Sequence, residues 1–302
     1  MSNLTCKDLY GGMTALVTPM STDGSIDYSQ WRTLIDYQIK ANIKAIVVAG
    51  TTGESALITN NEFEKLLKIA VDCCQSTITK VIAQTGSIRA DSVIEKNGIA
   101  QKCGVDALLI VTPYYIRTTQ EGLYQHFLKI ANTAKLPIIL YNVPTRTQID
   151  LQVKTSALLA KHPMIIGIKE ASVDPDRITQ LVELLPTEFA ILSGNDDTFL
   201  DSLQEGAHGV ISVASNVRPV TISKICDFVA LRDIISAKKL NSSLVSLFKM
   251  LSYQPNPIPV KYFMHQAGLI GDGIRLPLVW LNEEIEGCTI EQKKIIKEYS
   301  NI

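Results

Sequence analysis

One lysine ends a run of apolar residues that has the length and composition of a buried strand. Lys169 closes the segment Ile-Ile-Gly-Ile-Lys, residues 165–169, whose branched side chains favour a strand. Side chains alternate along a strand, so Ile165, Gly167 and Lys169 are predicted to share one face. A buried, unpaired ammonium group is costly, and the neutral amine that forms instead attacks carbonyl carbons to give a Schiff base. The alternative is that Lys169 lies just past the strand and reaches solvent or pairs with Glu170.

Three other features would suit a carbonyl substrate that carries a carboxylate. Tyr141 ends a second strand-like run and could transfer protons while an imine forms. The turn at residues 50–53, Gly-Thr-Thr-Gly, offers hydroxyl groups and close backbone approach, and Arg146 could clamp a carboxylate with two hydrogen bonds. Each feature alone has a simpler interpretation, as a turn or a solvated charge. Their meaning depends on whether the fold brings them together.

An alternation of strand-like and helical segments predicts that fold. Eight short β-branched runs occur, at residues 13–17, 45–49, 80–83, 107–111, 137–141, 165–169, 190–193 and 209–213. Helical periodicity follows each run, at residues 26–41, 59–74, 89–102, 119–134, 151–160, 175–184, 198–204 and 219–231. Eight such units predict an α/β protein of the (β/α)8 TIM-barrel class. A doubly wound sheet is the rival fold, but the glycine-rich turn expected after its first strand is absent at residues 17–20.

Helix signals in this pattern give local predictions. Asp27 lies near an N-cap, and Thr59 with Glu62 forms a capping box. Pro175 and Pro219 are predicted to occupy first turns of helices.

The chain divides into two predicted units. Residues 1–232 form the barrel, and residues 233–302 form a small helical appendage in which strand signals are absent. Within it, helices are expected at residues 233–250, 260–267 and 290–299, with a proline-rich connector at 254–259. Because no low-complexity linker separates the units, we expect the appendage to pack on the barrel.

Barrels of this class carry their active sites at the carboxyl ends of the strands. Tyr141 and Lys169 then end adjacent strands on one rim, together with the turn at residues 50–54 and the turn at residues 193–196. A tyrosine beside a Schiff-base lysine can shuttle protons as the carbinolamine forms and collapses.

Composition excludes several other classes of function. The 302 residues are 46% hydrophobic and 20% charged with a net charge of −1, so neither nucleic acid nor an anionic membrane is an expected partner. The first residues lack the apolar core of a signal peptide, and no apolar run reaches membrane-spanning length, which predicts a cytoplasmic protein. The histidines and cysteines are scattered without metal-ligand spacing, so no metal site is expected.

Taken in order, these motifs resemble those of the dihydrodipicolinate synthase family, within the pyruvate-dependent class I aldolases. The resemblance covers essentially the whole chain, through GTTGES (50–55), TPYY (112–115), YNVPTRT (141–147), GIKEA (167–171), GVISV (209–213), NPIPVK (256–261) and Leu276-Pro277. It implies condensation of pyruvate with L-aspartate 4-semialdehyde in diaminopimelate and lysine synthesis, without a cofactor.

The resemblance also implies catalytic roles. Lys169 matches the Schiff-base lysine, and Tyr141 matches the tyrosine that donates and accepts protons. Thr51 and Tyr115 match the rest of the family's proton relay, in which the second tyrosine comes from a neighbouring subunit. A homotetramer built from tight dimers is therefore implied.

Four more positions match substrate-binding residues of the family. Thr52 and Ile211 match positions that bind pyruvate, the latter through its backbone. Arg146 matches the arginine that holds the carboxylate of the semialdehyde, and Gly194 lies near the same pocket.

The chain departs from the family where lysine binds in feedback-regulated relatives. Tyr114 and Ser55 remain, but two histidines, an asparagine and a glutamate are replaced by Asn60, Phe63, Ile88 and Ser92. Without the carboxylate that would hold the ammonium group of lysine, we predict weak or absent inhibition. Gln84 and Gln148 also stand where the family commonly has glycine, and both are expected to reshape the rim of the site.

Other functions fit parts of this pattern. N-acetylneuraminate lyase and 2-keto-3-deoxygluconate aldolase share the lysine and the tyrosine, but Arg146 and the second threonine of GTTGE favour the synthase. A barrel that binds carboxylates without catalysis would have no use for Lys169, Tyr141 and Thr51. A phosphate-binding isomerase is disfavoured because the turns at 193–196 and 212–216 are not glycine-rich phosphate cradles.

Overall fold

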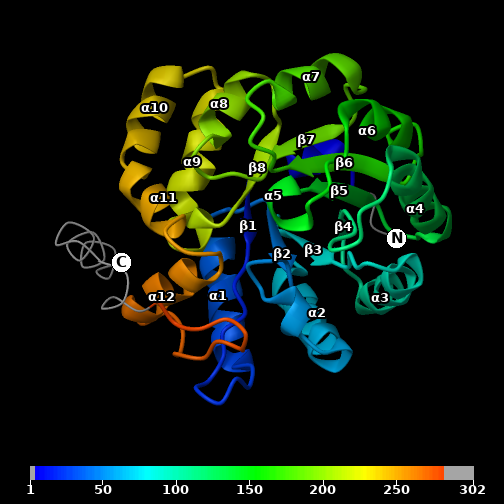
Figure 1. The fold of residues 1–302 in the computed structure, drawn as a ribbon. Helices are drawn as coiled ribbons and strands as arrows, with labels where there is room; N and C mark the ends of the chain where they lie inside the picture. The colour runs from blue at the N-terminus through cyan, green and yellow to red at the C-terminus, as the bar shows by residue number, and fades with distance from the viewer. Residues whose placement is uncertain (1–3, 282–302) are drawn as a thin grey trace.

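Eight parallel strands close into a barrel in their sequence order (Figure 1). The structure is a computed structural model that describes residues 4–281. The strands are β1 (Gly11–Ala15), β2 (Ala45–Val48), β3 (Lys80–Gln84), β4 (Ala107–Val111), β5 (Ile138–Asn142), β6 (Ile165–Glu170), β7 (Ala190–Ser193) and β8 (Gly209–Ser212). Since β8 pairs with β1, no strand edge stays open, and the predicted (β/α)8 barrel is confirmed.

Helices form the outer ring of the barrel. They are α1 (Tyr28–Lys40), α2 (Asn60–Cys74), α3 (Ala90–Cys103), α4 (Gln120–Thr133), α6 (Val153–Leu159), α7 (Arg177–Leu184), α8 (Phe199–Gln204) and α9 (Pro219–Ala230). The predicted N-cap is confirmed because Asp27 accepts from the backbone of Ser29 and Gln30. The predicted capping box of Thr59 and Glu62 is also present at the start of α2.

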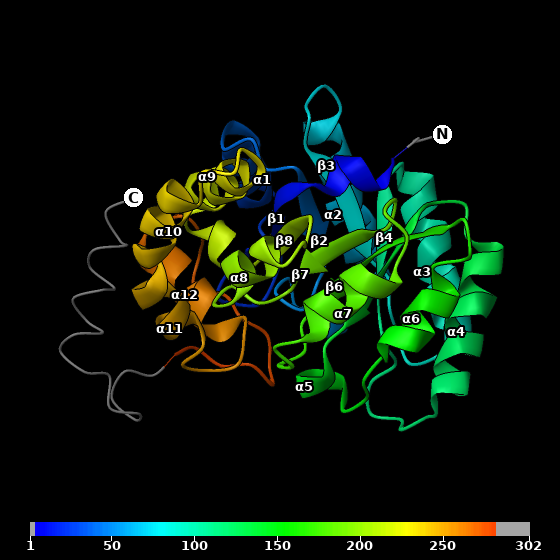
Figure 2. The ribbon, with the colours of Figure 1, turned by 90° about the horizontal axis from the view of Figure 1, so that it is seen from above.

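Short elements lie at both ends of the barrel. At the carboxyl end are α5 (Pro144–Thr147), η2 (Ser55–Leu57) and η3 (Ala214–Asn216), and η1 (Cys6–Leu9) precedes β1. Figure 2 shows the blue η1 segment and the green α5 at opposite edges of the barrel. Leu9 and Cys6 pack into the core inside the barrel, so η1 closes the amino end.

Two apolar cores follow from the alternation of side chains along the strands. Val47, Leu109 and Leu192 pack inside the barrel, whereas Ile46 and Ile110 pack between the strands and the helices. Both faces of each strand are thus buried, which explains the continuous apolar runs in the sequence.

A bulge in β6 corrects the predicted face of Ile165. Ile138 of β5 pairs with Ile165, but the next residue, Ile139, pairs with Gly167, so Ile166 is the extra residue. Ile165 consequently packs in the outer core, while Lys169 points into the barrel. The prediction that the two share a face is wrong for this reason.

The first strand lies two residues earlier than predicted. Gly11 and Gly12 join the ladder because β8 approaches very closely there: a Cβ on Gly209 would lie 2.4 Å from the Gly11 carbonyl oxygen. The ladder ends before Val17, whose N–H donates instead to the Asn216 side chain at 3.0 Å.

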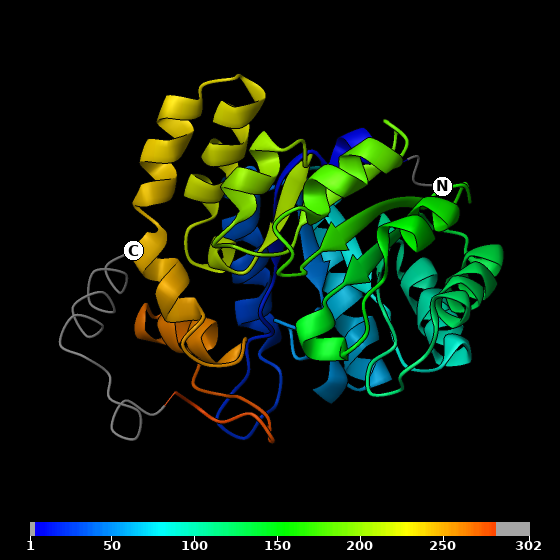
Figure 3. The same cartoon turned by 45° about the horizontal axis from the view of Figure 1, so that its top comes forward.

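The helices after the barrel are α10 (Ile234–Ser242), α11 (Val245–Leu251) and α12 (Ile258–Gln266). Figure 3 shows these yellow and orange helices grouped beside α8 and α9, and α10 packs on α9. The single helix predicted for residues 233–250 is broken because the Ser242 and Ser243 hydroxyls donate to the carbonyls of Lys239 and Leu240. The helix predicted for 290–299 lies outside the described residues, and the division at residue 232 remains a prediction.

Pro175 does not occupy a first helical turn, contrary to the prediction. The Asp174 side chain accepts from the Asp176 backbone at 3.1 Å, and this local turn delays the start of α7 to Arg177. Pro219 does lie at the start of α9.

Residues after α12 return to the helix that follows β2. The Arg275 guanidinium contacts the Glu62 carboxylate on α2 and the Leu57 carbonyl oxygen. This pairing lowers the pKa of Glu62 to about 2. No helix within residues 4–281 is long and apolar enough to cross a membrane.

Candidate active site

A cavity of about 230 Å³ lies at the carboxyl end of the barrel. It is lined by six of the eight predicted site residues, namely Lys169, Tyr141, Thr51, Thr52, Arg146 and Gly194. The fold therefore brings together residues that lie at or just after the ends of β2, β5, β6 and β7.

Lys169 and Tyr141 are direct neighbours in this cavity. They are Cα partners in the ladder between β5 and β6, and the Lys169 Nζ lies 4.5 Å from the centroid of the Tyr141 ring. Lys169 is only 5% exposed and Tyr141 6%. The alternative in which Lys169 reaches solvent or pairs with Glu170 is excluded, because Glu170 is hydrogen-bonded to Asn142 on the outer face of the sheet.

Gly194 leaves the room that Lys169 needs. A Cβ at this position would lie 2.7 Å from the Ala171 Cβ and 3.0 Å from the Lys169 Cε. The Gly194 N–H donates to the Glu170 carbonyl oxygen at 2.7 Å, which holds the turn after β7 tightly against β6. The glycine thus sets the side-chain space on one side of the lysine.

Asp196 also lines the cavity and was not predicted as a site residue. Its carboxylate accepts from the Ser212 hydroxyl at 2.5 Å and from the backbone N–H groups of Val213 and Ala214 at 3.0 and 2.8 Å. Burial raises the pKa of Asp196, and these donors together with the charge of Lys169 oppose that rise. The only feature of the sequence that could have indicated a role for Asp196 is its position directly after the end of a strand.

The GTTGE turn is held in place by the C-terminal segment. The Asn256 amide donates to the Thr52 hydroxyl at 2.9 Å. Glu54 forms an ion pair with Lys261 in which both side chains are fully buried. Burial lowers the pKa of Lys261, and the charge of Glu54 opposes the shift.

Residues after the barrel also complete the wall of the cavity. Arg146, on α5, donates to the Asn256 carbonyl oxygen at 3.0 Å. Phe248, Leu251 and Ser252 of α11 and its end line the same cavity. These contributions were not predicted, because the helical pattern of residues 233–250 gives no indication of which barrel end it covers.

Tyr115 and Ile211 do not line this cavity. Tyr115 follows β4 with a positive φ of 71° and is 91% exposed. Ile211 is fully buried in the core inside the barrel.

The two departures from glycine are structurally distinct. Gln148 caps α5 in the left-handed conformation, with φ of 58°, which costs a non-glycine residue roughly 1–2 kcal/mol. Gln84 ends β3, and its Nε2 lies 3.4 Å from the Ser55 hydroxyl. It lines a second cavity, of about 320 Å³, together with Ser55, Lys96 and Tyr114.

Across residues 4–281, histidine, cysteine, aspartate and glutamate side chains form no group that could hold a metal ion. The chemistry available in the cavity is that of an amine, a phenol, hydroxyls, a guanidinium and a carboxylate.

A closed (β/α)8 barrel with a buried lysine beside a tyrosine at the carboxyl ends of its strands has the arrangement of a Schiff-base-forming barrel enzyme. The sequence matches the Dihydrodipicolinate synthetase family over residues 8–298, and the chain belongs to this family.

Individual relatives agree with this assignment. The chain is 43% identical to the 4-hydroxy-tetrahydrodipicolinate synthase of Dechloromonas aromatica, over 90% of this chain and 93% of that protein. The chloride-inhibited dihydrodipicolinate synthase of Acinetobacter baumannii, complexed with pyruvate, superposes with a TM-score of 0.90 at 38% identity, covering 96% and 97% of the two chains. A monomeric dihydrodipicolinate synthase variant superposes with a TM-score of 0.92 at 35% identity, covering 98% of each chain.

Substitution of Gly194 by alanine tests the space around Lys169. The added methyl group would displace the lysine side chain or the turn, so formation of an imine with a carbonyl substrate is expected to slow by about 10- to 100-fold. The rate is measured by quenching with borohydride at successive times. Gly98→Ala is the matched control, because a Cβ on α3 at that position has no neighbour within 4 Å. A Gly194→Ala variant as fast as the wild type would contradict the role given to this glycine.

Proposed function

We propose that this protein is a 4-hydroxy-tetrahydrodipicolinate synthase that condenses pyruvate with L-aspartate 4-semialdehyde. The observation that carries the proposal is the pairing of buried Lys169 with Tyr141 in a cavity whose mouth holds Arg146. Membership of the family and the printed activity of its relatives support the same reaction.

The reaction begins when the Lys169 amine attacks the ketone carbon of pyruvate. The carbinolamine loses water to give an imine, and loss of a proton from the methyl group gives an enamine. Tyr141 supplies and removes protons in these steps, with Thr51 beside it in the cavity and Tyr115 completing the relay. The enamine carbon then attacks the aldehyde, and the amine of the bound semialdehyde displaces Lys169 as the product cyclises.

Carboxylate recognition decides which carbonyl compounds react. Thr52 and the backbone at Ile211 hold the carboxylate of pyruvate, and Gly194 bounds the same pocket. Arg146 receives the carboxylate of the semialdehyde, because a guanidinium group offers two parallel donors. The hydrogen bond from Arg146 to Asn256 supports this role by orienting the side chain toward the cavity mouth.

Trapping with borohydride tests the first chemical step. Incubation of the wild type with pyruvate and borohydride should add a reduced pyruvyl group to the peptide that contains Lys169, as measured by mass spectrometry. Lys261 provides an internal control, since it is also buried but paired with Glu54. An unmodified Lys169 peptide would contradict the proposal. Turnover is then compared between aspartate semialdehyde and the substrates of the rival enzymes, N-acetylneuraminate and 2-keto-3-deoxygluconate. Faster turnover of either rival would assign the chain to that activity instead.

Tyr115 is proposed to act in the site of a partner subunit within a tight dimer of a cytoplasmic homotetramer. Its exposure in a single chain supports this, since a relay tyrosine needs to reach a cavity. Tyr115→Phe should slow turnover and leave pyruvate binding nearly unchanged. A mixture of Tyr115→Phe and Lys169→Met chains should regain activity, because hybrid dimers contain one intact site, up to about a quarter of all sites.

Sedimentation of the wild type gives the matching measurement of assembly. A monomer at assay concentration with full activity would contradict the shared site, and the monomeric relative shows that the fold alone does not decide the assembly.

Weak or absent inhibition by lysine is the third expectation. Phe63 is buried in the core and Asn60 lies 3.4 Å from Glu95, so neither side chain resembles the imidazoles of regulated relatives. Lys96 in the neighbouring cavity would repel the ammonium group of a lysine ligand. Steady-state rates at rising lysine concentration should stay nearly constant, and Ser92→Glu should introduce sensitivity. Complete inhibition of the wild type at sub-millimolar lysine would refute the expectation.

A further inference from the structure

The residues that follow Tyr141 and Lys169 form a second pair, on the other face of the sheet. Asn142 and Glu170 are Cα partners and are the last residues of β5 and β6. Because side chains alternate, they point away from the barrel interior, and neither lines the substrate cavity. Asn142 is completely buried and Glu170 is 3% exposed.

Both the nitrogen and the oxygen of the Asn142 side chain form hydrogen bonds. Its Nδ2 donates to both carboxylate oxygens of Glu170 at 3.0 Å and to the Asp150 Oδ1 at 2.8 Å. Its Oδ1 accepts from the Leu151 N–H at 2.9 Å. This amide has one orientation, since the flipped form would set its oxygen against the two carboxylates and its nitrogen against the Leu151 N–H.

The Glu170 carboxylate is the acceptor in each of its hydrogen bonds. In addition to Asn142, the Ser172 N–H donates to its Oε1 at 2.7 Å. Burial raises the pKa of Glu170, and the donors from Asn142 and Ser172 oppose the rise. The partners of Glu170 are all donors, so an ionised carboxylate, which only accepts, can form a hydrogen bond with each of them.

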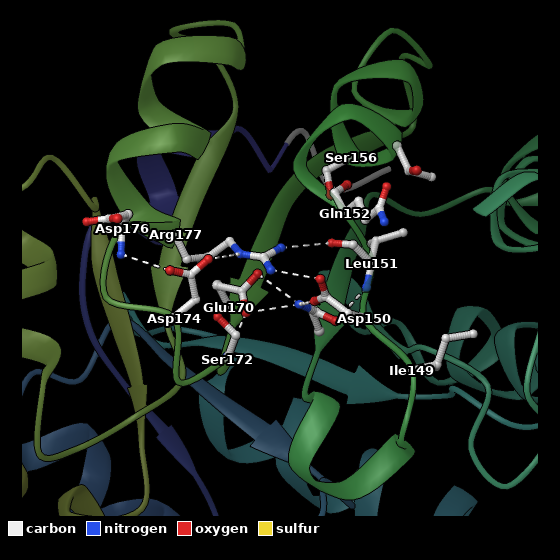
Figure 4. Close-up of polar contacts among 12 residues, drawn as sticks. Ile149, Asp150, Leu151, Gln152, Ser156, Glu170, Ser172, Asp174, Asp176 and Arg177 are labelled. Carbon is white, nitrogen blue, oxygen red and sulfur yellow. Dashed lines mark hydrogen bonds and ion pairs between the residues drawn. The ribbon is translucent and has the colours of Figure 1, made fainter. Parts of the chain in front are cut away.

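An arginine from α7 anchors the pair to the outer ring of helices (Figure 4). Arg177 donates to the Asp150 Oδ2 at 2.7 Å and to the Leu151 carbonyl oxygen at 3.3 Å, and its Nε lies 3.6 Å from the Asp174 carboxylate. It is only 8% exposed. Two charged groups act on Glu170 from this cluster: Arg177 opposes the rise in its pKa, and Asp150 adds to it.

We propose that Asn142 and Glu170 are positioning residues that hold Tyr141 and Lys169 in register for proton transfer. The strand ladder ends at this pair, where a barrel strand would otherwise separate from its neighbour. The hydrogen bonds between the Asn142 and Glu170 side chains hold the two strand ends together on the outer face. The preceding pair, Tyr141 and Lys169, therefore keeps its geometry. This inference rests on the proposed function, since it assumes that Tyr141 serves the imine of Lys169.

Glu170→Gln is the test variant. Its amide keeps one acceptor oxygen for Ser172, but its nitrogen is a donor that faces the donating Nδ2 of Asn142. The link between the strand ends is therefore weakened at constant side-chain size. The rate of imine formation, from timed borohydride quenching, is expected to fall by about 10- to 100-fold. The final yield of trapped imine and the KM for pyruvate should stay within about twofold, because the cavity wall is unchanged.

Asp174→Asn is the matched control. It removes one negative charge from the same cluster. The Asp174 side chain contacts Arg177 and the Asp176 N–H but neither Asn142 nor Glu170, so the imine should form at the wild-type rate. If Glu170→Gln fails to fold, Asn142→Ser takes its place, because it breaks the link and leaves the Ser172 hydrogen bond to Glu170 intact.

The outcomes separate the two hypotheses. A wild type without any trapped imine at Lys169 overturns the proposed function. If the imine is trapped in the wild type and forms equally fast in Glu170→Gln, the positioning role is overturned. A variant that loses imine yield and raises the pyruvate KM in proportion to its lost rate also overturns it, because the residue would then shape the pocket instead of the proton transfer.

Discussion

The register between β5 and β6 is the constraint on which the site depends. It sets Tyr141 opposite Lys169 on the inner face and Asn142 opposite Glu170 on the outer face. A shift of one residue would exchange these faces, placing a carboxylate in the barrel and the lysine against the helices. The bulge at Ile166 lies upstream in β6 and adjusts the strand so that the lysine, and not its neighbour, points inward.

A second constraint acts from the opposite side of the cavity. The buried ion pair of Glu54 and Lys261 ties the GTTGE turn to α12, and Asn256 bridges the turn to Arg146. A buried ion pair is weak support for stability by itself, since desolvation offsets much of the attraction between the charges. Its value here is geometric, because the two buried side chains must meet, and their contact fixes the turn against α12.

Much of this arrangement could be predicted from sequence. Local signals, such as the strand-like runs and the Thr59 capping box, are properties of short segments, so the barrel followed from them. Six of the eight predicted site residues line the cavity, and several of these were identified through the motifs that resemble those of the family. The bulge could not be predicted, because it depends on how Ile138 and Ile139 meet β6 across the ladder. The wall formed by Phe248 and Leu251 was missed for a related reason: a helical pattern indicates that a face is buried but does not identify what covers it.

The residues that line the cavity are far apart in the sequence and are therefore synthesised at different times. Its lining begins at Ala15 and ends at Asn256, and Glu54 precedes its counter-ion by 207 residues. At typical elongation rates of about 5–20 residues per second, that separation corresponds to roughly 10–40 s of synthesis. Every barrel strand has then been made while the last wall of the cavity is still missing. The nascent chain therefore carries its lysine long before it has a closed chamber, and the C-terminal segment acts as the final step of construction.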